Sequence, residues 1–498
     1  MSISRMVMAP LWLAIFYLDF MILTANAQIS SQLQNPSQSE YERCTSQEGG
    51  DAGISACTLA IEQETRDSAE RKAYLLTLRA RALLGQGKAE EAVADFTTAL
   101  ETDPNYLPAF LNRAEMFRAR DQCSEAIADY DKILAQDAKH MEALLGRATC
   151  RASLGTLDTA SADIKQVLEA DPKNESGFSY RAWQLKGKIE SLQGDQDAAL
   201  QSIEKAMGLR SPAPELYVER GLIWAARREY TKATADYDEA IKLDPQNKLG
   251  HHVNALILKA DNAVRTGDLE GAYALYSAAI GLSPENSTLY LDRAAISLRR
   301  NQSQLAQVDL DTAVARDPQN SLALVARANY FRSLGQYPRA LVDYDEAVKN
   351  NAEDLNAHGE RGLVHFYMGD YAKAASDFEY VVTQQPRLHA ALFLYISKRR
   401  LNNLQAARTD LDKVLNSTPN DWPRPVAELL LDRRTLEATL ASAKGDEQRC
   451  EGDFYAGEWH ALRGNKLAAQ KLFAAVQEKC PPEMIEHRGA VEELKRLK

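Results

Sequence analysis

Small and bulky apolar positions recur along the chain with a period of 34 residues. A fixed period of this length indicates a repeat architecture. Eleven units follow when position 1 is placed at Ala73, Leu107, Met141, Tyr180, Pro214, Val253, Ser287, Ser321, Leu355, Leu388 and Cys450.

Four positions define the pattern of each unit. Position 20 is alanine in every unit, and position 8 is glycine or alanine in every unit except the tenth, which has Tyr395. Position 24 is mostly aromatic or branched apolar, as in Tyr237, and position 32 is often proline, as in Pro245. Small residues let two antiparallel helices approach closely, the bulky residue fills the space beside them, and proline ends the second helix. Each unit therefore predicts a helix hairpin.

This pattern resembles the tetratricopeptide repeat, over roughly residues 36 to 483. The resemblance implies an all-α solenoid, a right-handed superhelix of antiparallel hairpins whose first helices line the concave side. We expect the following segments: a signal peptide in 1–27, a linker and degenerate first hairpin in 28–72, ten units in 73–421, a helical insert in 422–449, the last unit in 450–483, and a polar C-terminal capping helix in 484–498.

Two units break phase by five additional residues, 175–179 and 248–252. No proline interrupts either stretch, so we expect the first helix of both units to be longer by a turn or more.

The N-terminal segment 1–27 differs from the repeats. Its apolar run from Met8 to Leu18 precedes Ala25-Asn26-Ala27, a typical cleavage site, so we expect a secretory signal and a mature chain that begins near Gln28. Asp19 interrupts the apolar character, and an N-terminal membrane anchor stays open as the alternative. No other stretch reaches the ~20 apolar residues of a membrane span. The protein is thus expected to be periplasmic or secreted.

The net charge and the absence of known catalytic motifs exclude some classes of function. The formal net charge of -11 argues against a general nucleic-acid binder, which needs a surplus of lysine and arginine. The sequence lacks G-x-x-x-x-G-K-[ST], G-x-S-x-G, H-E-x-x-H and G-x-G-x-x-G, and the repeats leave no segment for a catalytic domain. His358 and His365 could share a helix face, but they occupy packing positions, so we interpret them as core residues. We expect no catalysis, no cofactor and no metal.

A ladder of opposite charges runs through the repeats at positions 7 and 23. Arginine at position 7 coincides with aspartate at position 23, whereas the two units with Lys186 and Lys259 have Ser202 and Leu275 instead. The pairs are Arg79 and Asp95, Arg113 and Asp129, Arg147 and Asp163, Arg220 and Asp236, Arg293 and Asp309, Arg327 and Asp343, and Arg361 and Asp377.

This coincidence matches a planar guanidinium that binds a carboxylate through two hydrogen bonds, a geometry that lysine cannot reproduce. We therefore interpret the pairs as structural bridges that pin each hairpin. The alternative is a positive stripe that binds an acidic peptide or glycan, best supported at Lys186 and Lys259. In the tenth unit Asp410 occurs with Leu394, which limits the rule.

Six cysteines behind a secretory signal indicate disulfides. Within the hairpins that the resemblance implies, three local pairs are expected: Cys44 with Cys57, Cys123 with Cys150, and Cys450 with Cys480.

Position 5 of the repeat faces the concave surface in the resembled family, and here it is largely apolar. Such a stripe on a groove predicts a partner surface for a helix or extended peptide; the alternative is that these side chains only pad neighbouring hairpins. The predicted groove residues are Leu111, Leu145, Lys186, Val218, Leu222, Ile257, Lys259, Leu291 and Val325.

These features together predict a non-catalytic scaffold of the bacterial cell envelope that binds a protein or peptide. The alternative from another class is a binder of a non-protein envelope ligand, such as a glycan. That alternative predicts aromatic residues and unpaired charges in the groove rather than an aliphatic stripe.

Overall fold

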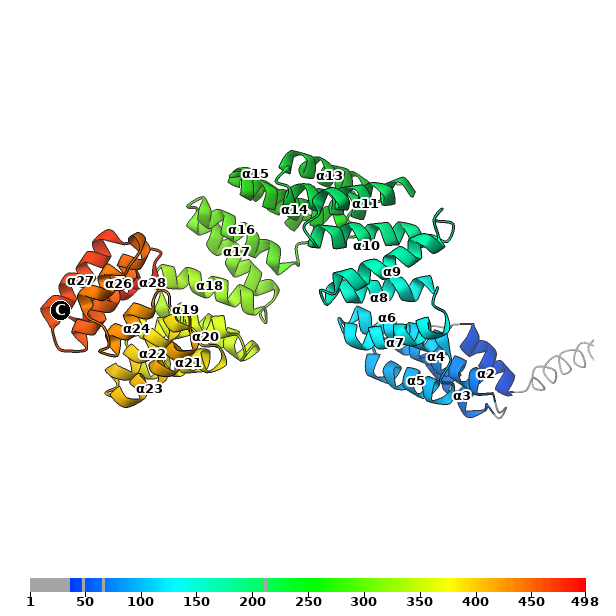
Figure 1. Ribbon diagram of the computed structural model, residues 1–498, viewed down its shortest axis with the longest axis horizontal. Coiled ribbons are helices and arrows are strands. Elements are labelled where there is room, and N and C mark those ends of the chain that lie inside the picture. Colours follow the sequence, from blue (N-terminus) through cyan, green and yellow to red (C-terminus); the bar gives the residue numbers. More distant parts are fainter. Residues whose placement is uncertain (1–35, 47–49, 65–67, 210–212) are drawn as a thin grey trace, which may run out of the picture. The chain divides into compact units, whose positions relative to one another are not determined.

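The computed structural model describes residues 36–46, 50–64, 68–209 and 213–498, and α-helices form its regular secondary structure (Figure 1). No strand occurs in these ranges, and none of their helices is both long and apolar enough to cross a membrane. The predicted signal peptide 1–27 lies outside the described residues. The chain divides into two compact units, Met1–Leu243 and Asp244–Lys498.

The N-terminal unit contains consecutive helix hairpins. The helices are α2 (Pro36–Thr45), α3 (Gly50–Glu62), α4 (Ala69–Gly85), α5 (Ala89–Thr102), α6 (Leu107–Ala119), α7 (Cys123–Gln136), α8 (Met141–Ser153), α9 (Leu157–Ala170), α10 (Phe178–Leu192), α11 (Gln196–Leu209), α12 (Pro214–Ala226) and α13 (Tyr230–Leu243).

The C-terminal unit continues the same pattern. Its helices are α14 (His251–Thr266), α15 (Leu269–Leu282), α16 (Ser287–Arg299), α17 (Ser303–Arg316), α18 (Ser321–Ser333), α19 (Tyr337–Asn350), α20 (Leu355–Met368), α21 (Tyr371–Gln384), α22 (Leu388–Arg400), α23 (Leu404–Ser417), α24 (Arg424–Leu430), α25 (Leu436–Ala441), α26 (Gly445–Ala461), α27 (Lys466–Lys479) and α28 (Ile485–Arg496).

Three positions of the repeat explain why each unit folds as a hairpin. The alanine at position 20 is fully buried in all eleven units, from Ala92 to Ala469. The two helices meet at this position, and a side chain larger than alanine would separate them. The bulky residue at position 24 is buried beside it, as in Tyr130 and Tyr237. Position 15, between the two helices, has positive φ in every unit, and it is usually Gly, Asn or Asp, which tolerate that conformation best. Arg228 is the exception.

The two five-residue insertions do not add a helical turn. Helices α10 and α14 begin only two residues before position 1 of their units, and the other inserted residues form a loop. In the first loop the Asp171 carboxylate accepts hydrogen bonds from the backbone N–H groups of Phe178 and Ser179. The expected lengthening is therefore wrong, because an aspartate caps the helix start instead.

The second loop repeats this geometry. The Asp244 carboxylate accepts from His251 N at 3.0 Å, and Asn247 Oδ1 accepts from Val253 N at 3.0 Å. Asn174 makes the equivalent bond to Tyr180 N at 2.9 Å in the first loop. The recurring Asp-Pro-x-Asn-x-x-Gly sequence thus forms one kind of capped loop.

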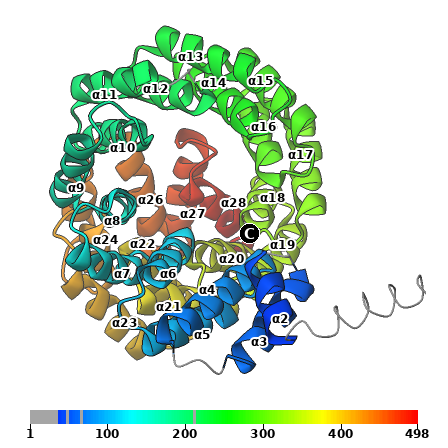
Figure 2. The ribbon, with the colours of Figure 1, turned by 90° about the vertical axis from the view of Figure 1, so that its right-hand side faces the viewer.

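Helix α28 follows the last hairpin and packs against α26, α27 and α20 (Figure 2). Tyr367 donates its hydroxyl hydrogen to the Ile485 carbonyl at 2.9 Å, and Tyr337 donates to Glu492 at 2.9 Å. The face that α28 buries includes Glu486 and Glu493. The expected polar cap therefore returns along the C-terminal unit and buries carboxylates there.

Candidate functional site: the inner faces of the repeats

All seven predicted arginine and aspartate pairs form bidentate bridges. In each pair Nε donates to Oδ2 at 2.7–3.0 Å and Nη2 donates to Oδ1 at 2.6–2.8 Å. The aspartates are buried; Asp236, for example, is 5% exposed. Hydrogen bonding to Asp236 raises the pKa of Arg220. Each bridge joins the two helices of one hairpin.

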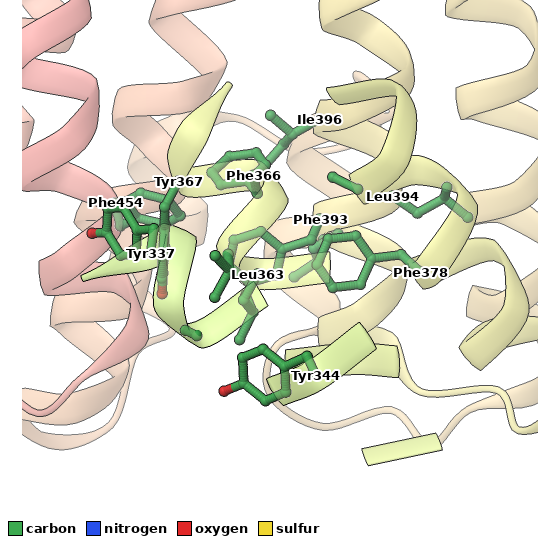
Figure 3. Packing of buried hydrophobic residues seen from close by; sticks show 14 of the residues in the cluster. Tyr337, Tyr344, Leu363, Phe366, Tyr367, Phe378, Phe393, Leu394, Ile396 and Phe454 are labelled. Atoms are coloured by element: carbon green, nitrogen blue, oxygen red, sulfur yellow. The ribbon is translucent and has the colours of Figure 1, made fainter. Parts of the chain in front are cut away.

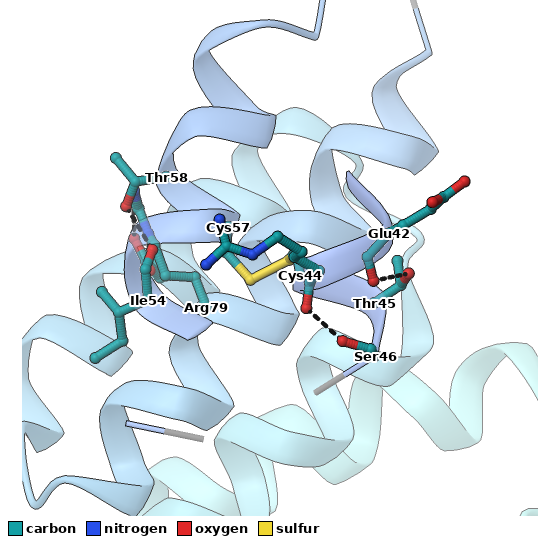
Figure 4. The surroundings of a disulfide bond; sticks show 10 residues. Glu42, Cys44, Thr45, Ser46, Ile54, Cys57, Thr58 and Arg79 are labelled. Atoms are coloured by element: carbon teal, nitrogen blue, oxygen red, sulfur yellow. Dashed lines mark hydrogen bonds and ion pairs between the residues drawn. A yellow bond between two sulfur atoms is a disulfide. The ribbon is translucent and has the colours of Figure 1, made fainter. Parts of the chain in front are cut away.

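The remaining guanidinium nitrogen connects neighbouring hairpins. Arg113 Nη1 donates to Thr97 Oγ1 at 3.0 Å, and Arg327 Nη1 donates to Asp311 at 3.1 Å. These acceptors lie at position 25 of the preceding unit. At the N-terminal end Arg79 reaches Thr58 of α3 in the same way, at 3.1 Å (Figure 4). The arginine therefore joins three helices, a role that the pairwise pattern in the sequence does not reveal.

Two departures from the ladder keep a related bridge. Lys186 contacts Glu190, which lies one turn later on α10, and Ser202 donates to Glu190 at 2.6 Å. In the tenth unit Lys398 contacts Asp410 at 2.6 Å and Glu379 of the preceding hairpin at 2.8 Å. In the first case the carboxylate lies on the first helix instead of the second, and in the other the basic residue lies one turn later on the first helix.

The ladder is therefore a frame and not a free positive stripe. Its guanidinium donors are used within the protein, which leaves them little capacity for a ligand. Lys186 and Lys259, where the alternative interpretation was best supported, both have interaction partners. The alternative interpretation, a free positive stripe, therefore gains no support at Lys186, where Glu190 lies outside the two ladder positions.

Two of the three predicted disulfides are present. Cys44 bonds to Cys57 between α2 and α3 (Figure 4), and Cys450 bonds to Cys480 between α26 and the end of α27. Each disulfide closes a terminal hairpin.

The predicted third disulfide is absent, because Cys123 and Cys150 are free thiols. Their sulfur atoms lie 2.6 Å apart, beyond the bonding distance of about 2.05 Å. Burial, together with the hydrogen bond to Cys123, raises the pKa of Cys150 to about 12. Both thiols are buried, and the Cys150 thiol therefore has little thiolate character.

The two histidines singled out in the sequence lie in the core. His358 Nδ1 lies 3.0 Å from Asp377 Oδ1, and its Nε2 lies 3.2 Å from the Ala352 carbonyl. Burial lowers the pKa of His365. Among the described residues no group of three His, Cys, Asp or Glu side chains could hold a metal.

Position 5 supplies less open surface than a groove stripe needs. Leu145, Val218 and Val325 are only 2%, 5% and 6% exposed, and Leu111, Ile257 and Leu291 are half-buried. Leu111, Leu145, Leu291 and Val325 pack in or against apolar clusters that adjacent hairpins share. Leu222, at position 9, is 45% exposed and faces solvent.

Two hollows lie in the N-terminal unit, between α8, α10, α11 and α12. The first has a volume of 190 Å³ and is lined by Leu145, Thr149, Arg181, Gln184, Leu185, Lys188 and Glu219. The second has a volume of 120 Å³ and is lined by Lys188, Ser191, Leu192, Ile203, Glu219, Leu222 and Ile223.

Lys188 and Glu219 line both hollows, so the two adjoin. We call the residues around them the α10 groove. It includes Leu145 and Leu222 of the predicted set, whereas Arg181, Gln184, Lys188 and Glu219 were missed. A signal was present, because Gln184 replaces the aliphatic residue that most units have at position 5.

The Glu219 carboxylate of the α10 groove is only partly hydrogen-bonded. Its Oε1 accepts a hydrogen bond from Gln184 at 3.0 Å, whereas its buried Oε2 has no hydrogen-bond partner. Burial raises the pKa of Glu219 above its ordinary value. A buried acceptor without a donor costs about 1–3 kcal/mol. A ligand N–H group would recover part of that free energy.

Comparison with protein families gives a consistent description of the chain. Tetratricopeptide repeat models match residues 77–138, 111–175, 291–354 and 325–388, and two further models of this repeat match 214–247 and 180–212. Together the matches cover more than half of the chain. A curated relative, the DnaJ homolog subfamily C member 7 homolog of Schizosaccharomyces pombe, is 29% identical over 140 residues. That alignment spans 26% of this chain and 29% of the relative.

Several solved structures align with low similarity. A tetratricopeptide repeat protein from Parabacteroides merdae has a TM-score of 0.37 at 16% identity, over 56% of this chain and 98% of its own. Yeast Tom70 has a TM-score of 0.34 at 14% identity, over 86% of this chain and 96% of its own. Pseudomonas aeruginosa pilF has a TM-score of 0.37 at 19% identity, over 46% of this chain and 99% of its own. Scores this low carry no argument about the function of this chain.

Proposed function

The chain belongs to the tetratricopeptide repeat superfamily, and from that premise we propose that it is a scaffold that binds a protein or peptide segment in the α10 groove. Repeats of this kind generally serve protein–protein interaction without catalysis. The observation that carries the proposal is the pair of adjoining hollows around Lys188 and Glu219. They are lined by residues of three consecutive first helices, α8, α10 and α12, together with Ile203 of α11.

The chemistry of the α10 groove suits a peptide. Leu192 and Leu222 are 65% and 45% exposed and offer apolar contact, while Glu219 Oε2 can accept a backbone or side-chain N–H. Arg181 and Lys188 can contact carbonyl or carboxylate oxygens. No aromatic side chain lines either hollow, so the glycan-binding alternative gains no support here.

Export to the envelope forms part of the same proposal. It is supported by the signal-like sequence of residues 1–27 and by the disulfides of the two terminal hairpins, since disulfides persist mainly in oxidising compartments. N-terminal sequencing of the mature protein tests it, with Gln28 as the expected first residue. A cytoplasmic chain that keeps residues 1–27 would contradict export.

Crosslinking and affinity capture from the native cell test the α10 groove. We expect Leu222→Asp and Lys188→Glu to reduce capture of a discrete partner by about tenfold or more, the effect of losing a central contact. Leu243→Asp is the matched control, because Leu243 is 46% exposed but lies outside the groove. Unchanged capture by both groove variants, with helicity retained, would refute this assignment.

A further inference from the structure

A larger cavity lies within the C-terminal unit, between α20, α21, α22 and the start of α28. Its volume is 420 Å³, and it is lined by Leu355, Asn356, Gly359, Glu360, Leu363, Phe378, Val381, Arg387, Leu388, His389, Ala390, Phe393 and Ile485. Small-molecule and side-chain pockets typically measure about 300–1,000 Å³.

The cavity floor is apolar. Phe378 and Phe393 stack with ring centroids 5.5 Å apart, and Leu363 lies beside them (Figure 3). The buried side chains of Phe378, Val381 and Phe393 are 2%, 2% and 1% exposed. A ligand that enters the cavity therefore meets hydrocarbon at its base.

The cavity exists because position 5 of this unit is Gly359. Seven other units have Leu, Val or Ile at this position, including Leu291 and Val325 in the two preceding units. A Cβ atom added at Gly359 would meet only Val381 Cγ2, at 4.0 Å. The aliphatic side chain that occupies this space in most other units is missing here. The residues that line the cavity therefore lack the contacts that such a side chain would make.

Rim charges give the cavity a preferred ligand. Glu360 is paired with Arg332 at 3.1 Å, and His389 lies 3.4 Å from Glu451, whose hydrogen bond raises the pKa of His389. Arg387 is exposed and donates to Gln385 at 2.9 Å, but it forms no ion pair with any residue that the structure describes. The uncompensated rim charge is thus a positive one.

We propose that this Gly359 cavity binds an aliphatic side chain of a partner segment, with an adjacent acidic residue of that segment paired to Arg387. The inference rests on the proposed function, because it assumes a protein or peptide partner. It adds a second contact site and states which sequence that site selects. The Ile485 wall belongs to α28, so the docked C-terminal helix completes the site.

A phage-displayed library of random linear peptides, selected on the purified protein, tests the proposal. We expect the selected peptides to share an aliphatic residue close to Asp or Glu. They should bind the Gly359→Leu variant at least about tenfold more weakly, because leucine occupies the cavity. Gly281→Leu is the matched control, since Gly281 is a helical glycine with no atom within 4 Å of an added Cβ, and it should bind unchanged.

Arg387→Glu gives a second test that does not alter the core. It should abolish the preference for acidic peptides while helicity is retained. Equal binding to wild type and Gly359→Leu, or selected peptides without an aliphatic and acidic pair, would overturn the inference. If only the α10 groove variants lose their partner, the Gly359 cavity inference fails while the proposed function stands. If only Gly359→Leu and Arg387→Glu lose binding, the α10 groove assignment fails instead.

Discussion

Replacing Arg220 tests whether the arginine ladder is a frame. Arg220→Ala would leave the carboxylate of Asp236, whose side chain is 7% exposed, without its bidentate partner. Loss of one member of a buried ion pair typically costs 3–5 kcal/mol. Because the Arg220 side chain is 24% exposed and water can partly solvate the aspartate, we expect the lower end of that range, about 3 kcal/mol.

The matched control is an exposed pair. Arg316 and Glu285 form an ion pair at 2.7 Å with side chains 40% and 77% exposed, so Arg316→Ala should cost less than about 1 kcal/mol. A double variant, Arg220→Met with Asp236→Leu, removes both charges. It should recover most of the lost stability, since apolar replacement of a buried pair is often neutral or stabilising.

Hydrogen exchange measured by mass spectrometry is the appropriate assay, because repeat arrays open locally and global unfolding is not two-state. A loss of about 3 kcal/mol speeds exchange in α12 and α13 by about a hundredfold, while peptides from distant hairpins stay unchanged. The frame interpretation is refuted if Arg220→Ala and Arg316→Ala have equal effects, or if the double variant is as unstable as Arg220→Ala.

Four further predictions concern the caps and the buried groups. Burial and nearby Glu451 raise the pKa of Glu486 to about 7, so its contribution to stability is complete below about pH 4.5 and is lost as pH rises through 7, up to about 3 kcal/mol. Glu486→Gln should therefore flatten the decline of the local opening free energy of α28 between pH 5 and 8, which hydrogen exchange corrected for the intrinsic exchange rate at each pH measures. An unchanged slope would contradict the assignment. Cys480→Ser opens a loop of 30 residues and should lower the stability of the last hairpin by about 3–4 kcal/mol in the chain-entropy model. Hydrogen exchange in α26 and α27 measures this loss, and unaltered exchange there would argue against a stabilising bond. Thiol titration of the unreduced protein in denaturant should find two free thiols, Cys123 and Cys150, and a count of zero would show a third disulfide. Asp171→Ala should lower the local stability of the α10 start by about 1–3 kcal/mol. Hydrogen exchange there should become faster, and an unchanged exchange rate would mean that the cap is dispensable.

The periodic features of the sequence determined the fold. Position 20 is alanine because two helix backbones meet there, and this close approach is the same in every unit, so the pattern is visible without the structure. The spacing between Arg220 and Asp236 likewise fixed the bridge, because both residues lie in one hairpin whose geometry the repeat defines. The terminal disulfides were predicted for the same reason.

Features that depend on neighbouring hairpins were decided by the tertiary structure. The sequence did not reveal that Leu145 is buried, because the packing of α8 against adjacent hairpins removes its surface. It did not reveal that Lys398 replaces the missing arginine, since the bridging charge can move one turn along a helix and still reach Asp410. The return of α28 depends on contacts with residues more than a hundred positions earlier, such as Tyr367.

The candidate sites illustrate the same division. Gln184 and Gly359 are visible in the sequence as exceptions at an aliphatic position, but an exception alone does not state whether the space is filled by a neighbour or left open. The structure leaves it open at Gly359 and places the apolar floor, the Arg387 charge and the Ile485 wall around it. Local periodicity thus determined the hairpins, and the packing between hairpins decided where the inner surface is hollow.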